Sequence, residues 1–267
     1  MTQDHRFSVQ SQKVLVTGGT RGIGFAIAKA LRDAGADVYI HGMGRENTEA
    51  IAKSHGLKAV YADLRNDEER KHLVRTLHNE LDRLDILFNN AGFEMYSPIE
   101  CAQESFLDDI YRVNARSPFL LVRDLLDLLK SSGSASVINV TSIHQDVPVK
   151  GNSSYCMAKA SLDMFTKVAA LELAKWNIRV NTLAPGAIIT DMNREIVQSM
   201  PFEKWIPLGS AGTVEDMVGP ALFLASAASR YMTGATLVVD GGYSQNLLRY
   251  EVEADGNCRL EHDNIRE

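Results

Sequence analysis

The chain has 267 residues, of which 45% are apolar and 23% charged, a composition typical of an ordinary globular protein. Its formal net charge of −6 argues against a dedicated nucleic-acid-binding protein, which usually carries a basic surplus. No apolar run approaches the ~20 residues needed to span a bilayer, and the polar start MTQDHRFSVQSQ lacks the features of a secretory signal. We therefore expect a cytoplasmic protein with a small-molecule substrate and no membrane or nucleic-acid partner.

Three cysteines, Cys101, Cys156 and Cys258, lie far apart in the chain. Their number is odd, and neither a CxxC motif nor a Cys/His cluster is present, so the pattern indicates no disulfide framework and no metal site.

Short apolar runs alternate with helical patterns along most of the chain. The expected strands are 13–17, 38–40, 59–62, 85–88, 136–141, 178–183 and 235–239, and the expected helices are 22–34, 46–55, 66–82, 104–130, 153–175 and 214–226. Seven strands interleaved with helices predict an α/β fold: one doubly wound parallel sheet with helices on both faces, the Rossmann architecture. We expect this single domain to cover residues 13–243, after a polar leader at 1–12.

Two stretches depart from the alternation. Residues 186–213 contain prolines and glycines with weak periodicity, which suggests a mobile segment over a site. Residues 244–267 form a polar tail, and from Arg249 to Glu267 it holds six acids and three arginines. We expect this tail to be partly disordered or to lie on a neighbouring subunit.

A glycine-rich turn, Thr17-Gly-Gly-Thr-Arg-Gly-Ile-Gly24, joins the first expected strand to the first expected helix. Glycines there let the backbone approach a pyrophosphate, and the helix N-terminus offers free N–H groups. The spacing is GxxxGxG and not GxGxxG, but its position between strand and helix predicts a dinucleotide site.

The end of the second expected strand bears on which dinucleotide binds. The sequence there, Tyr39-Ile-His-Gly-Met-Gly-Arg-Glu46, has no acid where the strand stops to bind a ribose 2′-hydroxyl. Arg21 and Arg45 could instead pair with a 2′-phosphate, which favours NADP over NAD. If both arginines are only solvated and bind no phosphate, NAD remains the alternative cofactor.

Tyr155 and Lys159 share one face of an expected helix at positions i and i+4. A phenol with a pKa near ~10 is a poor base at neutral pH. An ammonium one turn away favours the phenolate and lowers that pKa. Ser142 lies thirteen residues earlier, at the end of an expected strand, so the three side chains are candidates for one proton-transfer site.

Together these motifs resemble the short-chain dehydrogenase/reductase (SDR) family over about residues 11–243. The resemblance rests on the glycine-rich turn, Asn89-Asn-Ala-Gly92, Asn114, Ser142, Tyr155-x3-Lys159, Pro185-Gly186 and Asp240-Gly-Gly242. It implies a sheet in the order 3-2-1-4-5-6-7, an NAD(P)-dependent oxidoreductase and a homotetramer. It also implies a catalytic set in which Tyr155 is the general acid or base, Ser142 binds the reacting oxygen, Lys159 lowers the tyrosine pKa and Asn114 holds a relay water.

The resemblance further implies the residues that bind the cofactor. Asp63 would contact adenine, residues 90–92 would border the adenosine, and Ile188 and Thr190 would reach the carboxamide. The full set is Gly18, Thr20, Arg21, Gly22, Ile23, Gly24, Asp63, Leu64, Asn90, Ala91, Gly92, Tyr155, Lys159, Pro185, Gly186, Ile188 and Thr190.

Two polar residues suggest a substrate class. Glu94 follows the Asn-Asn-Ala-Gly motif and His144 follows Ser142, and polar groups in a pocket suit a polyhydroxylated substrate. Both stretches resemble the glucose 1-dehydrogenase branch, which oxidises an aldose C1 hydroxyl to a lactone. We therefore expect a sugar or polyol dehydrogenase, with Glu94, Ser142, His144 and Tyr155 binding substrate.

Other interpretations stay open. Glu94 could lie on the rim and His144 could face solvent. The enzyme could instead reduce a 3-oxoacyl thioester or another small carbonyl, because the glycine-rich turn also resembles those NADP enzymes. A third interpretation is a regulatory protein that binds a dinucleotide without catalysis, although such a protein would not need Tyr155.

The expected helix at 104–130 is apolar on more than one side, with leucines at 120, 121, 125, 128 and 129. The expected helix at 153–175 is also long and apolar on more than one side. Such a helix is either buried within its subunit or part of an interface. With the oligomer that the resemblance implies, an interface is favoured, and full burial within one subunit stays open.

Overall fold

A computed structural model describes residues 5–191, 193–246, 250–252 and 258–260. Seven parallel strands form one sheet in the order β3-β2-β1-β4-β5-β6-β9, which confirms the predicted order with β9 as the seventh strand. Their bounds are β1 Lys13–Val16, β2 Asp37–Gly42, β3 Lys58–Tyr61, β4 Ile86–Asn89, β5 Ser136–Val140, β6 Arg179–Pro185 and β9 Thr236–Val239.

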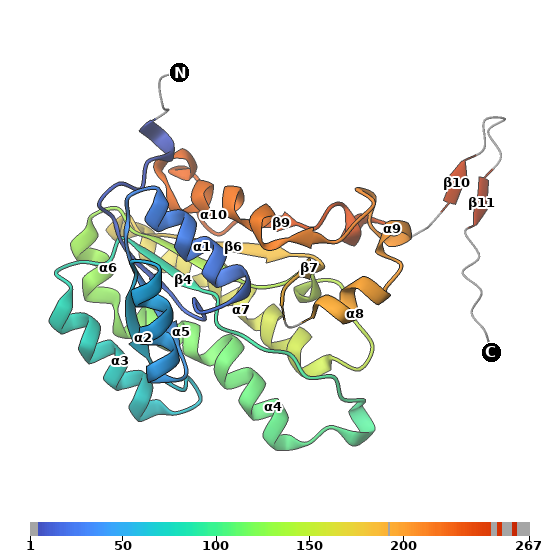
Figure 1. Ribbon diagram of the computed structural model, residues 1–267, viewed down its shortest axis with the longest axis horizontal. Helices are drawn as coiled ribbons and strands as arrows, with labels where there is room; N and C mark the ends of the chain where they lie inside the picture. The colour runs from blue at the N-terminus through green and yellow to red at the C-terminus, as the bar shows by residue number, and fades with distance from the viewer. Residues whose placement is uncertain (1–4, 192, 247–249, 253–257, 261–267) are drawn as a thin grey trace.

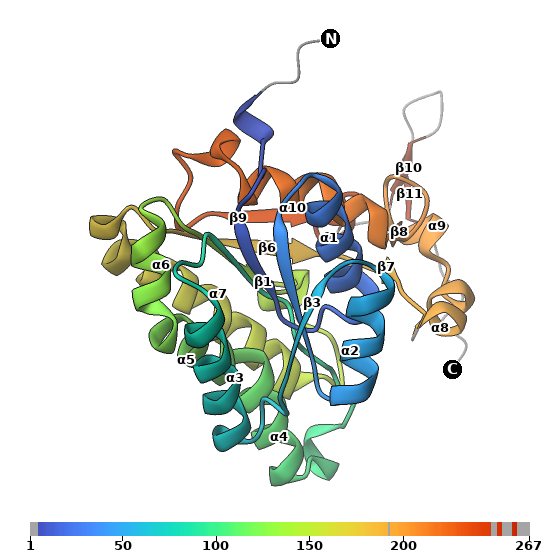
Figure 2. The same cartoon turned by 60° about the vertical axis from the view of Figure 1, so that its left-hand side comes forward.

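Helices cover both faces of the sheet (Figures 1 and 2). One face carries α1 (Gly22–Asp33), α2 (Arg45–Ser54) and α10 (Val218–Ala225), and the other carries α3 (Asp67–Glu80), α5 (Ser117–Asp124), α6 (Leu126–Ser132) and α7 (Ser153–Leu173). Because side chains alternate along a strand, Val14 and Val16 enter the first core and Leu15 the second. Each face therefore buries its own hydrophobic layer.

Residues 104–130 are helical as predicted, but they do not form one regular α-helix. The segment divides into α4 (Glu104–Tyr111), a π-helical turn (Arg112–Arg116), α5 and α6. Pro118 in the first turn of α5 has no N–H to donate to the carbonyl of Asn114 four residues earlier, so a regular α-helical ladder cannot continue through this point. Such π turns often occur at functional sites, and this one carries Asn114.

The leucines of that segment do not form an interface, which corrects the interpretation made from their pattern. All five are at most 7% exposed, because α5 and α6 bury them against the sheet and α7. The open alternative of burial within one subunit is the correct one.

Short elements occupy the stretch with weak periodicity. Strands β7 (Ile188–Ile189) and β8 (Gly212–Thr213) pair in parallel, and helices α8 (Arg194–Ser199) and α9 (Phe202–Trp205) lie between them in the chain. In the tail, β10 (Tyr250–Val252) and β11 (Cys258–Leu260) form an antiparallel pair. The rest of the segment from 247 onward, and with it the expected disorder or contact with a neighbour, lies outside the described residues.

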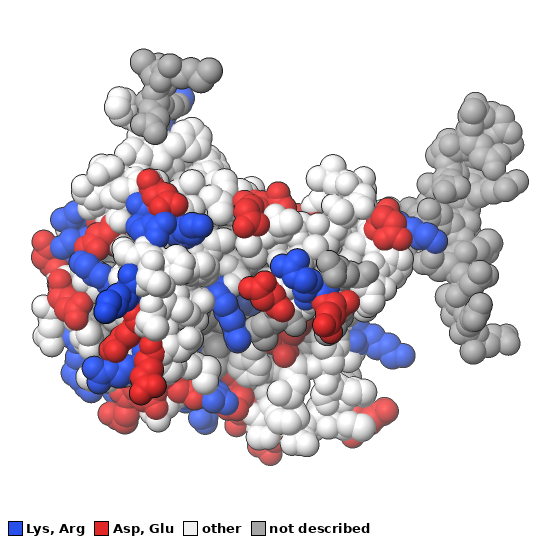
Figure 3. Space-filling view, viewed as in Figure 1, with Lys and Arg blue, Asp and Glu red and all other residues white. Residues whose placement is uncertain are grey.

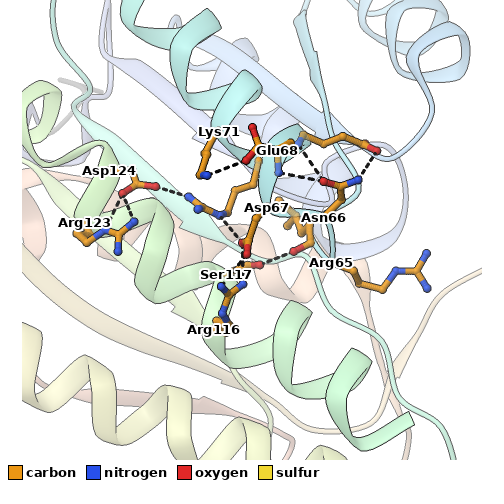
Figure 4. Close-up of polar contacts among 12 residues, drawn as sticks. Arg65, Asn66, Asp67, Glu68, Lys71, Arg116, Ser117, Arg123 and Asp124 are labelled. Atoms are coloured by element: carbon orange, nitrogen blue, oxygen red, sulfur yellow. Dashed lines mark hydrogen bonds and ion pairs between the residues drawn. The ribbon is translucent and has the colours of Figure 1, made fainter. Parts of the chain in front are cut away.

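A network of ion pairs joins α3 to α5, and Figure 4 labels four of its members, Asp67, Arg116, Arg123 and Asp124. Arg70 is only 2% exposed and forms an ion pair with Asp124, which also accepts from Arg123 at 2.7 Å. Asp67, at the start of α3, lies 3.7 Å from Arg70 and binds Arg116 of the π turn at 2.8 Å. The network therefore fixes the π turn against the start of α3.

We predict that Asp124→Ala lowers the free energy of unfolding by about 3–5 kcal/mol, because it leaves the buried Arg70 charge poorly compensated. Glu68→Ala is the matched control, since it removes the exposed partner of the neighbouring Lys71 and should cost under about 1 kcal/mol. Urea unfolding of the two variants measures both values, and equal losses would contradict the prediction.

Candidate active site

Four predicted catalytic residues meet beyond the carboxyl ends of β4 and β5. Ser142 follows β5, Tyr155 and Lys159 lie in the first two turns of α7, and Asn114 lies in the π turn. Lys159 Nζ donates to the carbonyl of Val140 at 2.9 Å and lies 5.5 Å from the centre of the Tyr155 ring. The backbone of β5 therefore holds the ammonium beside the tyrosine.

Asn114 has an oxygen with no hydrogen-bond partner. Its Nδ2 donates to the carbonyls of Phe93 at 2.9 Å and Ile110 at 3.0 Å, while its buried Oδ1 finds no partner among the described residues. A Cβ on Gly92 would lie 2.5 Å from this Oδ1 and 3.3 Å from Lys159 Nζ. Both polar atoms thus border one small space that the glycine keeps open, and a water there would satisfy Asn114.

Burial changes the pKa of both Tyr155 and Lys159. Desolvation first, and the negative charge of Glu94 second, raise the pKa of Tyr155 above its ordinary value, and hydrogen bonding with Ser142 opposes them. Desolvation lowers the pKa of Lys159 to about 8, against the opposing effect of Glu94. Without added positive charge the tyrosine is neutral, so it can donate a proton; it can accept one only when a cation nearby stabilises the phenolate.

Hydrogen bonds join the glycine-rich turn to the segment after β4. Thr17 Oγ1 accepts from the N–H groups of Asn90 at 2.9 Å and Ala91 at 3.0 Å, and Asn90 Nδ2 donates back to the carbonyl of Thr17 at 2.9 Å. Gly24 must be glycine, because a Cβ there would lie 2.3 Å from Asn90 Nδ2. Helix α1 then begins with no acid in its first turn and no side-chain cap, so its N–H groups are free to bind a pyrophosphate.

Other predicted cofactor residues border the same edge. Gly22, with φ +56°, faces Thr190: a Cβ there would lie 3.5 Å from Thr190 Cγ2. Ile188 is buried in β7, and Gly186 packs against Asp240, where a Cβ would lie 2.5 Å from the aspartate Cβ. The turn after β1 and the segment after β6 therefore lie side by side at this edge of the sheet, as a dinucleotide site between them requires.

The residues expected near the adenosine have partners of their own. Asp63 binds Arg65 at 2.7 Å, and this hydrogen bond holds the pKa of the carboxyl below its usual range. The buried Leu64 accepts a hydrogen bond from Ser117 at 2.9 Å through its carbonyl. Arg45 pairs with Glu49 at 2.9 Å and lies over the Tyr61 ring, whereas Arg21 is exposed and forms no ion pair within residues 5–191 and 193–246.

Sequence reasoning missed His41, which supports the glycine-rich turn. Its Nδ1 accepts from the N–H of Gly18 at 3.2 Å, and its Nε2 contacts the carbonyl of Ala62 at 2.9 Å. This arrangement requires a neutral imidazole that donates through Nε2, and burial lowers the pKa of His41. The only signal in the sequence was a polar residue within an apolar strand.

We predict that His41 makes the protein sensitive to acid. Because the pKa is lower in the folded state than in the unfolded state, the unfolded chain binds more protons below about pH 6.5, and stability falls as pH falls, by at most about 1.4 kcal/mol per pH unit. His41→Gln should remove this part of the slope. Urea unfolding between about pH 5 and pH 7.5 measures it, with the exposed-ring variant His72→Gln as control; parallel slopes for wild type and His41→Gln would contradict it.

The other two predicted substrate residues, Glu94 and His144, contact residues close in the chain to Tyr155 and Ser142. Glu94 Oε2 accepts from Asn152 Nδ2 at 2.9 Å, and Asn152, at the start of α7, was not predicted. His144 Nδ1 contacts the carbonyl of Val147 at 2.9 Å, and its backbone N–H donates to Ser142 Oγ at 3.2 Å. His144 is half-buried and Glu94 is exposed, so both are at least partly accessible to solvent.

The described residues include no helix long and apolar enough to cross a membrane. Within the same residues, His, Cys, Asp and Glu side chains form no group of three or more that could hold a metal ion. On the face seen in Figure 3, charges of both signs are interspersed over α2 and α3 without a patch of one sign.

Comparison with known proteins agrees with this geometry. Residues 18–244 match the family model described as enoyl-(acyl carrier protein) reductase. The chain is 40% identical to a 3-oxoacyl-(acyl-carrier-protein) reductase from Chlamydia pneumoniae over 86% of this chain and 96% of that protein. It is 30% identical to gluconate 5-dehydrogenase from Gluconobacter oxydans over 92% of this chain and 100% of that protein.

A solved structure is also similar. A gluconate 5-dehydrogenase from Burkholderia cenocepacia, in complex with NADP and tartrate, superposes with a TM-score of 0.85 at 28% identity and covers 91% of this chain and 99% of that one. A parallel dinucleotide-binding fold with a Ser–Tyr–Lys site defines an oxidoreductase class. The chain belongs to the short-chain dehydrogenase/reductase family, as its motifs indicated.

Proposed function

We propose that the protein transfers a hydride between NADP and a secondary alcohol or carbonyl, with a sugar or polyol as substrate. The observation that carries this is the convergence of Ser142, Tyr155 and Lys159 at the carboxyl end of β5, beside the glycine-rich turn. The acceptor oxygens of Glu94 beside this site support a polyhydroxylated substrate, because buried hydroxyls need partners.

In this mechanism Ser142 orients the reacting oxygen, and Tyr155 donates the proton in reduction or accepts it in oxidation. Lys159 holds positive charge beside the phenol and would bind the nicotinamide ribose, while Asn114 would hold a water that relays the proton by way of Lys159. The cofactor, when bound, would supply or accept the hydride. The residues predicted for the cofactor, from Gly18 to Gly24, at 63–64, at 90–92 and from Pro185 to Thr190, would hold it along the cleft.

A second candidate is reduction of a 3-oxoacyl thioester. It is favoured by the 40% identity to the Chlamydia pneumoniae reductase. The same catalytic residues would serve it, so substrate assays distinguish the two candidates. If the protein binds NADP but turns over neither class of substrate, those assays support a third candidate, a non-catalytic regulatory protein.

We predict that Tyr155→Phe lowers kcat by about 10²–10⁴-fold, because general acid–base catalysis contributes that much, while NADP binding is retained. Oxidation of aldoses and polyols and reduction of acetoacetyl thioesters, each with NAD and NADP, measure turnover, and fluorescence titration measures cofactor binding. Tyr231→Phe, at a fully exposed position, is the control. Unchanged turnover in Tyr155→Phe would reject the proposed mechanism.

For the cofactor, we propose that Arg21 pairs with the 2′-phosphate of NADP. Its guanidinium is exposed at the start of α1, whereas Arg45 already has Glu49 as partner. Arg21→Ala should therefore lower kcat/KM for NADP by about tenfold, the loss of a charge-assisted pair, and leave kcat/KM for NAD unchanged. Steady-state rates with each cofactor give the ratio of kcat/KM for NADP to kcat/KM for NAD. An unchanged ratio in Arg21→Ala would contradict the pairing of Arg21 with the 2′-phosphate.

We also propose a homotetramer in the cytoplasm. Exposed apolar side chains on the outer faces of α5 and α7, namely Phe119, Met164, Val168 and Leu171, support an interface, since Leu171 is 83% exposed. These residues replace the buried leucines as the basis for the proposal. The described cysteines, Cys101 and Cys156, are free thiols, which suits a reducing compartment.

A further inference from the structure

One asparagine makes three hydrogen bonds to the segment that begins with β7. Asn193 Oδ1 accepts from the backbone N–H of Thr190 at 2.7 Å and from the Thr190 hydroxyl at 3.0 Å. Its Nδ2 donates to the carbonyl of Ile188 at 3.0 Å. A backbone N–H can only donate and a carbonyl can only accept, so these two backbone partners fix which end of the Asn193 amide faces Thr190.

The amide in turn fixes the direction of the Thr190 hydroxyl. An amide oxygen can only accept, so the hydroxyl hydrogen of Thr190 points toward Asn193 Oδ1. A hydroxyl has one hydrogen and two lone pairs. With its hydrogen engaged by Asn193, Thr190 Oγ1 can only accept a further hydrogen bond, and a group that binds it must therefore be a donor.

Asn193 makes these contacts in place of the one that its position favours. It is the N-cap residue of α8, yet its side chain caps no N–H of that helix. Asparagine is among the preferred N-cap residues because its side-chain oxygen ordinarily accepts from an N–H of the first turn. Here that oxygen binds Thr190, so the arrangement fixes the threonine and leaves the start of α8 without its usual cap.

Thr190 lies beside the glycine-rich turn. A Cβ on Gly22 would lie 3.5 Å from Thr190 Cγ2, so the threonine faces the start of α1. Both Thr190 and Asn193 are half-buried, so neither is sealed from solvent. On a nicotinamide ring, the carboxamide has a donor end, its NH2 group, and an acceptor end, its carbonyl oxygen. A hydroxyl that can only accept distinguishes these two ends.

We propose that Asn193 is a positioning residue that holds the Thr190 hydroxyl as an acceptor, so that Thr190 binds the NH2 end of the nicotinamide carboxamide and not its carbonyl end. This rests on the cofactor site of the proposed function, and it adds which way round the carboxamide is held and which residue decides it. Without Asn193 the hydroxyl can rotate and bind either end.

Two analogues of NADP, each changed only at the carboxamide, test the proposal. The 3-acetylpyridine analogue keeps the carbonyl and has a methyl group in place of NH2, whereas the thionicotinamide analogue keeps NH2 and has sulfur in place of the oxygen. Calorimetric titration of the full chain without substrate measures the Kd of each oxidised cofactor. We expect wild type to bind the acetylpyridine analogue roughly tenfold more weakly than the thionicotinamide analogue, because the acetyl group leaves the Thr190 acceptor without a donor.

Variants of Asn193 separate positioning from mere support of the fold. Asn193→Ala frees the Thr190 hydroxyl to donate to the acetyl oxygen, so this variant should bind the acetylpyridine analogue roughly fivefold more tightly than wild type does. Loss of structure around Thr190 cannot produce such a gain. The gain should disappear when Asn193→Ala is combined with Thr190→Val, which lacks the hydroxyl. Asn193→Asp keeps an oxygen that accepts from Thr190 and should keep the wild-type preference.

The matched control is Arg194→Ala, which changes the next residue in the chain. Arg194 is exposed and pairs with Asp191 at 3.4 Å, so the ratio of the two analogue Kd values should not change.

Three results would overturn the proposal: equal binding of the two analogues by wild type, no gain for the acetylpyridine analogue in Asn193→Ala, or loss of the preference in Asn193→Asp. If NAD is the dinucleotide that binds, its corresponding analogues are measured instead, and binding of neither dinucleotide would also overturn it. None of these measurements requires turnover. The proposed catalysis is decided by turnover in Tyr155→Phe, so the two can fail separately.

Discussion

The packing of α7 on β5 and β6 is the constraint on which the active site depends. Tyr155 and Lys159 are both on α7, and their positions relative to Ser142 follow from how that helix is seated on the sheet. A series of hydrogen-bonded, buried polar side chains fixes the position of α7 on the sheet. Asn139 donates to Thr166 at 2.8 Å, and Thr182 contacts both Thr166 and Asp163 at 3.1 Å. Hydrogen bonds are directional, so these contacts specify one register that apolar packing alone leaves free to slide.

The same polar chain reaches both neighbouring strands. Asn89 of β4 donates to Asn139 at 2.8 Å, and Thr236 of β9 donates to Asp163 at 2.8 Å. Strand β4 leads directly into the segment that is bonded to the glycine-rich turn through Thr17 and Asn90. The glycine-rich turn and helix α7 are therefore positioned by one continuous set of contacts across the sheet edge. This explains why motifs far apart in the sequence lie close together.

The sheet and its strand order could be predicted, and so could the meeting of the proposed catalytic residues, because each depends on local patterns: apolar runs, glycine turns and the i, i+4 spacing of Tyr155 and Lys159. The break in the helix at 104–130 was missed, because the apolar pattern there masks the missing donor of Pro118. The burial of the five leucines could not be predicted either, because it depends on which elements pack against one another in the fold. His41 and Asn152 could not be found, since their partners, Gly18 and Glu94, are 23 and 58 residues away.

Glu94 acts against the chemistry that the rest of the site favours. Oxidation of an alcohol requires a phenolate at Tyr155, and a nearby carboxylate raises the pKa of that group, as burial does. Hydrogen bonding with Ser142 opposes both effects. The same carboxylate opposes the desolvation of Lys159, so it helps to keep the ammonium charged, but only in part. A group that raises the cost of the proton-transfer step is useful to the enzyme when it contributes more to substrate selection than it subtracts from the rate. The fixed bond from Asn152 is consistent with that role, because a carboxylate that merely lay on the rim would need no buried partner to orient it.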